Sequence, residues 1–231
     1  MNRAATFVRC SAALAALAVP GSGALAWAKN PPDTEKTAGA ITLSVYNYAQ
    51  VNRPALLAAE SEATRILGQA GVELSWVDCP TAHADRDNYP NCPSAWQEND
   101  FVMRVMPKAM VGLQEKTQDT LGSAIGCDSG PCSVAGVYFD RVWSLSGGAT
   151  APMPTLLGRV MAHEIGHLLL GPHAHSRVGI MRAFWVDHEL STAARQELVF
   201  TPEQSRQMKT RLAEQAQASQ AHAKVAGLGR Q

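Results

Sequence analysis

The stretch of residues 163–176, HEIGHLLLGPHAHS, constrains this chain more than any other. His163 and His167 are four residues apart, so on a helix both imidazoles project from one face and can reach one ion. Glu164 follows the first histidine, where its carboxylate can reach a water on that ion without being a ligand. Zinc takes neutral nitrogen ligands, and a nearby carboxylate can accept a proton from the bound water. The stretch therefore predicts a zinc-binding helix with Glu164 as general base.

The predicted helix, residues 156–170, is too apolar to face solvent. Its apolar positions are Leu156, Leu157, Val160, Met161, Ile165, Leu168 and Leu169. Burying two histidines and a glutamate among these side chains costs several kcal/mol unless something such as a metal ion compensates them. The setting thus strengthens the prediction of a metal site.

Gly171 and Pro172 end this helix, because glycine permits the turn and proline cannot continue the helix. The chain can then turn back and supply a third ligand from outside the helix. Two candidates follow at once, His173 and His175, and no spacing rule decides between them. Further on, Gly179-Ile180-Met181 offers a tight turn whose methionine can lie beneath the metal.

The pattern HEIGHLLLG...H...GIM resembles the metzincin clan of zinc metalloproteases, in which H-E-x-x-H-x-x-G-x-x-H is followed by a turn that contains methionine. It is most similar to small exported bacterial proteins that carry HEIGHLLLG, a His-Ser pair and then GIM. The resemblance is most specific over residues 162–185. It extends more weakly through YNYA at 46–49, AGVELSWVDC at 70–79 and FTPEQ at 200–204.

One departure from the clan pattern affects the third ligand. The clan's glycine, three residues after the second histidine, is Leu170 here, and the glycine comes one residue later. Strict counting makes His173 the third ligand, whereas the His-Ser pair of the bacterial proteins corresponds to His175-Ser176. The late glycine and the added proline are compatible with a longer return loop. We therefore favour His175 and keep His173 as the alternative.

The resemblance implies an exported zinc-dependent peptidase, an endopeptidase rather than an exopeptidase, with water at an open fourth position of the ion. Glu164 would take the proton of this water and pass it to the leaving amine. Met181 would form the methionine turn. An extended peptide would bind along an exposed strand edge, for which residues 135–142 are the candidate. The alternative function is a non-catalytic zinc-stabilised binding domain, in which His173 and His175 both ligate and close the site.

Residues 1–28 have the three parts of an export signal. Arg3 and Arg9 form the basic start, residues 11–19 the apolar centre, and Ala26-Trp27-Ala28 an A-x-A cleavage site. Cleavage would leave roughly 200 residues, which suits one domain with a sizeable core. No later stretch is long and apolar enough for stable membrane insertion. We expect a periplasmic or secreted protein.

The charge of the chain indicates which class of partner it can bind, and its cysteines indicate its compartment. The chain has 20 Lys and Arg against 20 Asp and Glu, so it offers no basic stripe for nucleic acid. The expected partner is a peptide or protein substrate, and we expect a monomer. Past the signal, four cysteines remain, and in an exported chain they predict two disulfides. Three pairings are possible, and we favour the local one, Cys79 with Cys92 and Cys127 with Cys132.

Hydrophobic periodicity predicts an α+β fold: a mixed, mostly parallel twisted sheet, with an active-site helix and a backing helix packed on it. The predicted strands are 41–48, 72–76, 101–106 and 135–142, the first two being parallel neighbours, and the predicted helices are 54–71, 156–170 and 201–218. Thr201, Pro202 and Gln204 form a helix start with a capping box. Loops are expected at 78–99 and 122–131.

The expected organisation is a flexible leader at 29–40, one metzincin-like catalytic domain at 41–218, and a disordered tail at 219–231. A smaller C-terminal part of the domain is expected to begin near residue 172.

Overall fold

The computed structural model describes residues 40–93, 100–111, 120–125, 134–147, 151–185, 190–191 and 198–228. The elements in chain order are β1 (Ala40–Asn47), α1 (Arg53–Gln69), β2 (Glu73–Cys79), the 3-10 helix η1 (His83–Asn88), β3 (Asp100–Met106), the 3-10 helix η2 (Lys108–Met110), β4 (Gly122–Ile125), β5 (Val134–Tyr138), α2 (Phe139–Ser146), α3 (Met153–Leu170) and α4 (Pro202–Leu228). The predicted signal peptide and nearly all of the predicted leader lie outside the described residues.

The sheet has five strands in the order β2-β1-β3-β5-β4. All neighbours are parallel except β4 and β5, which are antiparallel. The predicted parallel pairing of the first two strands is confirmed, and α1 connects them. This helix starts where the Asn52 side chain accepts a hydrogen bond from the Ala55 N–H, with proline in its first turn. The predicted mixed, mostly parallel sheet is confirmed.

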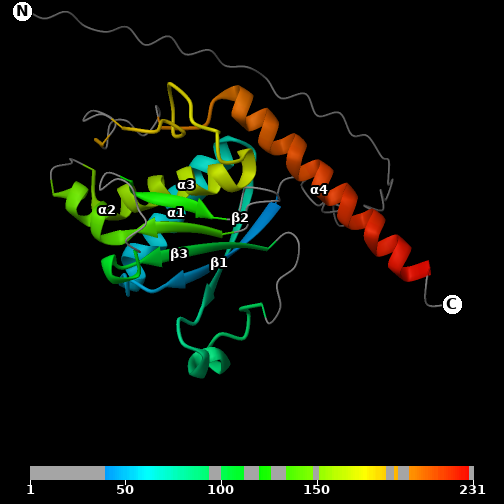
Figure 1. Cartoon of the computed structure of the whole chain (residues 1–231), viewed down its shortest axis with the longest axis horizontal. Helices are drawn as coiled ribbons and strands as arrows, with labels where there is room; N and C mark the ends of the chain where they lie inside the picture. Colours follow the sequence, from blue (N-terminus) through cyan, green and yellow to red (C-terminus); the bar gives the residue numbers. More distant parts are fainter. Residues whose placement is uncertain are drawn as a thin grey trace, which may run out of the picture. The chain divides into compact units, whose positions relative to one another are not determined.

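Helices α1 and α3 lie against each other and pack on one face of the sheet (Figure 1). Alternate strand residues such as Leu43 and Val45 are buried against them, as expected for period-two patterning. The two helices come into close contact at Gly158 of α3, where a Cβ atom would lie 2.4 Å from the Ala59 carbonyl oxygen of α1. Only glycine permits this approach, which holds α3 firmly in the core.

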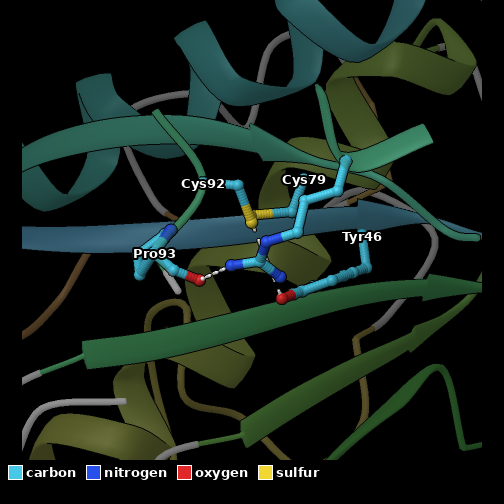
Figure 2. The surroundings of a disulfide bond; sticks show 5 residues. Tyr46, Cys79, Cys92 and Pro93 are labelled. Carbon is cyan, nitrogen blue, oxygen red and sulfur yellow. Dashed lines mark hydrogen bonds between the residues drawn. A yellow bond between two sulfur atoms is a disulfide. The ribbon is translucent and has the colours of Figure 1, made fainter. Parts of the chain in front are cut away.

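The loop after β2 is tied to the sheet by a disulfide between Cys79 and Cys92 (Figure 2). The Cys92 sulfur lies 3.8 Å from the Tyr46 hydroxyl of β1, and Arg86 donates a hydrogen bond of 2.7 Å to the Pro93 carbonyl oxygen. The predicted pairing of these two cysteines is confirmed. Cys127 and Cys132 lie outside the described residues.

Three predictions about elements are wrong. Residues 139–142 belong to α2 instead of continuing a strand, and residues 122–125 form β4 instead of a turn. Helix α4 continues to Leu228, so residues 219–228 are helical rather than disordered. In the part of the chain that is described, no helix has the length and apolar character needed to cross a membrane.

Candidate metal centre

Helix α3 places His163 and His167 one turn apart, with ring centroids separated by 4.9 Å. Each ring is fixed by a backbone carbonyl oxygen that faces its Nδ1 atom. The Ile180 oxygen lies 2.7 Å from Nδ1 of His163, and the Gly171 oxygen lies 3.1 Å from Nδ1 of His167. A carbonyl oxygen can only accept, so both Nδ1 atoms carry the hydrogen and both Nε2 atoms of the neutral rings hold a lone pair.

The electrostatic setting keeps these rings neutral. Burial lowers the pKa of His163 to about 4, and burial likewise lowers the pKa of His167 from its ordinary value. Neutral imidazole is the form that binds metal ions. The hydrogen bond from each Nδ1 to a carbonyl oxygen is also the usual way in which a ligating histidine is oriented.

The third imidazole comes from His175, in the return segment, which we define as residues 171–176. The Nε2 atom of His167 lies 3.1 Å from Nε2 of His163 and 3.1 Å from Nε2 of His175. These three residues form a group whose ligand atoms lie within 4.8 Å of one another. His173 is exposed and is not a member of this group. The structure therefore brings together His163, His167 and His175 and leaves His173 outside.

The donor set fits a zinc-sized cation. Two Nε2 lone pairs facing each other at 3.1 Å, as in His163 and His167, repel unless a cation lies between them. A tetrahedral zinc ion with Zn–N bonds of 2.0–2.1 Å separates its nitrogen ligands by about 3.3 Å. Among the residues that the structure describes, no other histidine, cysteine or carboxylate belongs to the group.

Met181 is buried in the core and packs against α3. It lies at the turn that was predicted from Gly179-Ile180-Met181. A Cβ atom on Gly166, between the two helical histidines, would lie 2.4 Å from the Met181 sulfur. The turn before it also supplies the Ile180 carbonyl oxygen that orients His163. The methionine turn is thus packed against the one part of α3 that carries the histidines.

A cavity of about 600 Å³ opens next to the three histidines, and Glu164 lines it together with them. The Glu164 carboxyl is buried, and burial raises its pKa to about 8. Trp185 also lines the cavity, and its ring lies edge-on to His163 with 6.0 Å between the centroids. The cavity therefore places a carboxyl group and three imidazoles on one shared surface.

Residues 120–124, which include most of β4, also line the cavity. Within the described part of the chain, β4 is paired on one side only, whereas β5 lies between β3 and β4. The prediction that residues 135–142 form the open edge is therefore wrong, and the edge at the cavity belongs to β4. Sequence reasoning missed this strand because its four residues, GSAI, are too few to show an alternating pattern.

Gly122, the first residue of β4, is the second feature that sequence reasoning missed. A Cβ atom there would lie 2.6 Å from Oε1 and 2.7 Å from Cγ of Glu164, and 2.7 Å from the Gly136 carbonyl oxygen. The backbone of the edge strand therefore touches the side chain of Glu164 directly. No local sequence signal reports such a contact between residues 42 positions apart.

No protein family and no curated protein matches this sequence. Among solved structures, the chain is similar to a zinc-dependent peptidase from Methanocorpusculum labreanum, with 16% identity, a TM-score of 0.47, and coverage of 72% of this chain and 99% of that one. It is also similar to an archaemetzincin from Methanopyrus kandleri, with 16% identity, a TM-score of 0.44, and coverage of 78% and 98%. At these values neither likeness establishes an activity for this chain.

Proposed function

We propose that this chain is an exported zinc-dependent peptidase in which His163, His167 and His175 hold the ion and Glu164 is the general base. The observation that carries the proposal is the convergence of three Nε2 atoms at a cavity that Glu164 also lines. Two of these atoms have their lone pairs aimed at each other by hydrogen bonds on the far side of the ring. A cation explains this arrangement, and a structural role for the histidines does not.

When bound, zinc lowers the pKa of a coordinated water and polarises a substrate carbonyl. The residues of the chain supply the remaining parts. The carboxyl of Glu164 would have its pKa lowered by the bound cation next to it, so that the ionised form accepts a proton from the attacking water and returns it to the leaving amine. Its place inside the cavity wall, between α3 and β4, gives the carboxylate a fixed position and little contact with solvent.

Substrate binding is assigned to the open edge of β4. The backbone groups on the side of β4 that has no neighbouring strand among the described residues can form main-chain hydrogen bonds with an extended peptide, and Gly122 to Ala124 line the cavity. Binding of this kind needs several consecutive peptide residues, which favours an endopeptidase over an exopeptidase. Export is supported by the basic, apolar and A-x-A parts of residues 1–28, and the Cys79–Cys92 disulfide suits an oxidising compartment.

The alternative of a closed, non-catalytic zinc site required His173 and His175 to bind the ion together. His173 and His175 are both exposed, but His173 lies outside the group of three histidines. The position next to the group is a cavity large enough for a substrate segment. These observations favour an open site.

The test replaces Glu164 with Gln, which keeps the size of the side chain and removes its basicity. The parent protein and the variant are each assayed for bound zinc and for cleavage of a broad library of unstructured peptides, with mass spectrometry of the new ends. We expect equal zinc content and a 10²–10⁴-fold loss of cleavage, the usual contribution of a general base. The exposed Glu73, changed to Gln, is the control and should retain full activity.

Two results contradict the proposal. If the Gln variant cleaves peptides as fast as the parent protein, Glu164 is not the general base. If the parent protein binds zinc but cleaves nothing in the library, the site belongs to a binding domain.

A further inference from the structure

The return segment must keep a fixed path, since it carries the third histidine without the support of a helix or sheet. It is held at its first residue, where the Gly171 carbonyl oxygen faces Nδ1 of His167 at 3.1 Å. It is held at its last residue, where the Ser176 N–H donates to the Met181 carbonyl oxygen at 2.8 Å. Both contacts lie at the ends of the segment and leave its middle to be fixed by something else.

The middle of the segment is held from α4. The Gln204 side-chain amide nitrogen donates a hydrogen bond of 3.4 Å to the Ala174 carbonyl oxygen, which directly precedes His175. Gln204 is 7% exposed. This hydrogen bond joins the start of α4 to the middle of the return segment.

The orientation of the Gln204 amide is determined by its partners. The Thr201 N–H can only donate, and it lies 3.0 Å from the Gln204 side-chain oxygen. The Ala174 carbonyl oxygen can only accept, so it must face the amide nitrogen. The Thr201 hydroxyl in turn accepts from the Gln204 backbone N–H at 3.2 Å, which completes the capping box expected from the sequence.

We propose that Gln204 is a positioning residue for the metal site: it holds the backbone beside His175 so that the third imidazole meets the other two. The proposal rests on the proposed function, since it concerns the same three histidines. It assigns the FTPEQ stretch a role beyond starting a helix, because one amide both caps α4 and fixes the return segment. Helix α4 is itself anchored at this end, as Arg211 donates a hydrogen bond of 3.0 Å to the Leu169 carbonyl oxygen at the end of α3.

The variant that separates the two roles of this amide is Gln204→Glu. A glutamate at this helix position still accepts from the Thr201 N–H, so the capping box remains. The glutamate carboxylate has no N–H to donate. Its second oxygen would face the Ala174 carbonyl oxygen, and two acceptors cannot form a hydrogen bond with each other. The substitution therefore removes the hold on the return segment and leaves the helix start intact.

Two control variants match this change. Gln207→Glu adds the same charge on the same helix. Gln207 and Gln204 both line a small cavity of about 420 Å³ beside the return segment, but the Gln207 side chain donates its hydrogen bond to Glu203. Thr201→Val removes the capping hydroxyl and keeps the Gln204 amide. If Gln204 only capped α4, Gln204→Glu would have no effect on metal binding, and only the loss of the cap in Thr201→Val would have an effect on the protein.

The experiment measures zinc affinity of the full chain by competition with a chromophoric chelator at pH 7.5, together with the melting temperature of the metal-free protein. We expect Gln204→Glu to weaken zinc binding about three- to tenfold, the factor that one hydrogen bond typically supports, with an unchanged melting temperature of the metal-free form. Gln207→Glu should bind zinc as the parent protein does. Thr201→Val should lower the melting temperature and leave zinc affinity within twofold.

Three results overturn the inference or its basis. Equal zinc affinity of Gln204→Glu and the parent protein refutes the positioning role while the proposed function stands. An equal loss in Gln204→Glu and Gln207→Glu assigns the effect to charge and likewise refutes it. A parent protein that binds no zinc refutes the proposed function itself.

Discussion

Replacing Gly122 with Ala tests whether the edge strand positions the general base. The added Cβ would lie 2.6 Å from the Glu164 Oε1 atom and 2.7 Å from the Gly136 carbonyl oxygen. Ordinary contacts of this kind are at about 3.4 Å or more, so one of the partners must move by roughly 0.7–0.8 Å. The Gly136 oxygen belongs to β5, a strand paired on both sides, so the Glu164 side chain or β4 itself must give way.

The size of the effect follows from that displacement. A misplacement of about 1 Å in a catalytic group costs on the order of 10²-fold in rate, or about 2.7 kcal/mol in activation free energy. Overpacking of the core costs a further ~1–3 kcal/mol in stability, which a modest fall in melting temperature would report. Because the atoms nearest to this Cβ belong to Glu164 and Gly136 and not to a histidine, zinc affinity should be unchanged.

The assay compares kcat/KM for peptide cleavage, zinc stoichiometry and melting temperature in Gly122→Ala and in a matched control, Gly68→Ala. Gly68 lies near the end of α1, and a Cβ there would meet nothing within 4 Å. Alanine at this helical position should stabilise the protein by about 0.5–1 kcal/mol and leave activity unchanged. A Gly122→Ala protein that retains zinc and cleaves peptides within threefold of the parent rate would refute this reasoning.

Two predictions concern stability. Changing Cys79 and Cys92 together to Ser opens a link between residues 13 apart and should lower the free energy of unfolding by about 3 kcal/mol in urea denaturation; a variant as stable as the oxidised parent protein would contradict this. The pKa of Glu60 is raised to about 7, chiefly by burial and then by the Asp78 charge. Ionisation of Glu60 therefore destabilises the folded state. This destabilisation is absent below the pKa of the unfolded state, near 4.5, and it increases with pH until it is complete above about 7. The free energy of unfolding is measured by urea denaturation at pH 5 and at pH 8 for the parent protein and for Glu60→Gln. The decrease from pH 5 to pH 8 should be about 1–3 kcal/mol smaller in the variant than in the parent protein. Equal decreases in both proteins would rule out this effect of Glu60.

Much of the helix that carries the site can be predicted from sequence because its signals are local. The spacing of His163 and His167, the apolar character of residues 156–170 and the Gly171-Pro172 stop all act within a few turns of one helix. The observed helix ends at Leu170, as expected, and Gly171 adopts a φ of 99°, a value that favours glycine.

The choice between His173 and His175 depends on contacts from distant parts of the chain. The path of the return segment is determined by the Met181 carbonyl oxygen and by Gln204, which lies 30 residues from its partner. Neither contact leaves a pattern in the segment itself. Spacing alone therefore leaves the two histidines equivalent, and the structure separates them.

The edge strand and α2 were missed for a related reason. Residues 134–146 form a strand that passes directly into a helix at Phe139, and no glycine or proline marks the change. The short strand β4 is a strand because β5 pairs with it, and tertiary pairing of this kind overrides weak local preference.

The central claim is that three imidazoles, one of them supplied by the return segment, bind a single divalent cation. The most direct measurement is a zinc titration of chelator-treated protein for the parent chain, His175→Ala and His173→Ala. The parent protein should bind one equivalent of zinc, and His173→Ala should bind it as tightly. His175→Ala should lose more than 10–100-fold in affinity, which is the loss seen when a residue that only hydrogen-bonds to a metal ligand is removed. A parent protein that binds no zinc, or a loss in His173→Ala equal to that in His175→Ala, would contradict the account.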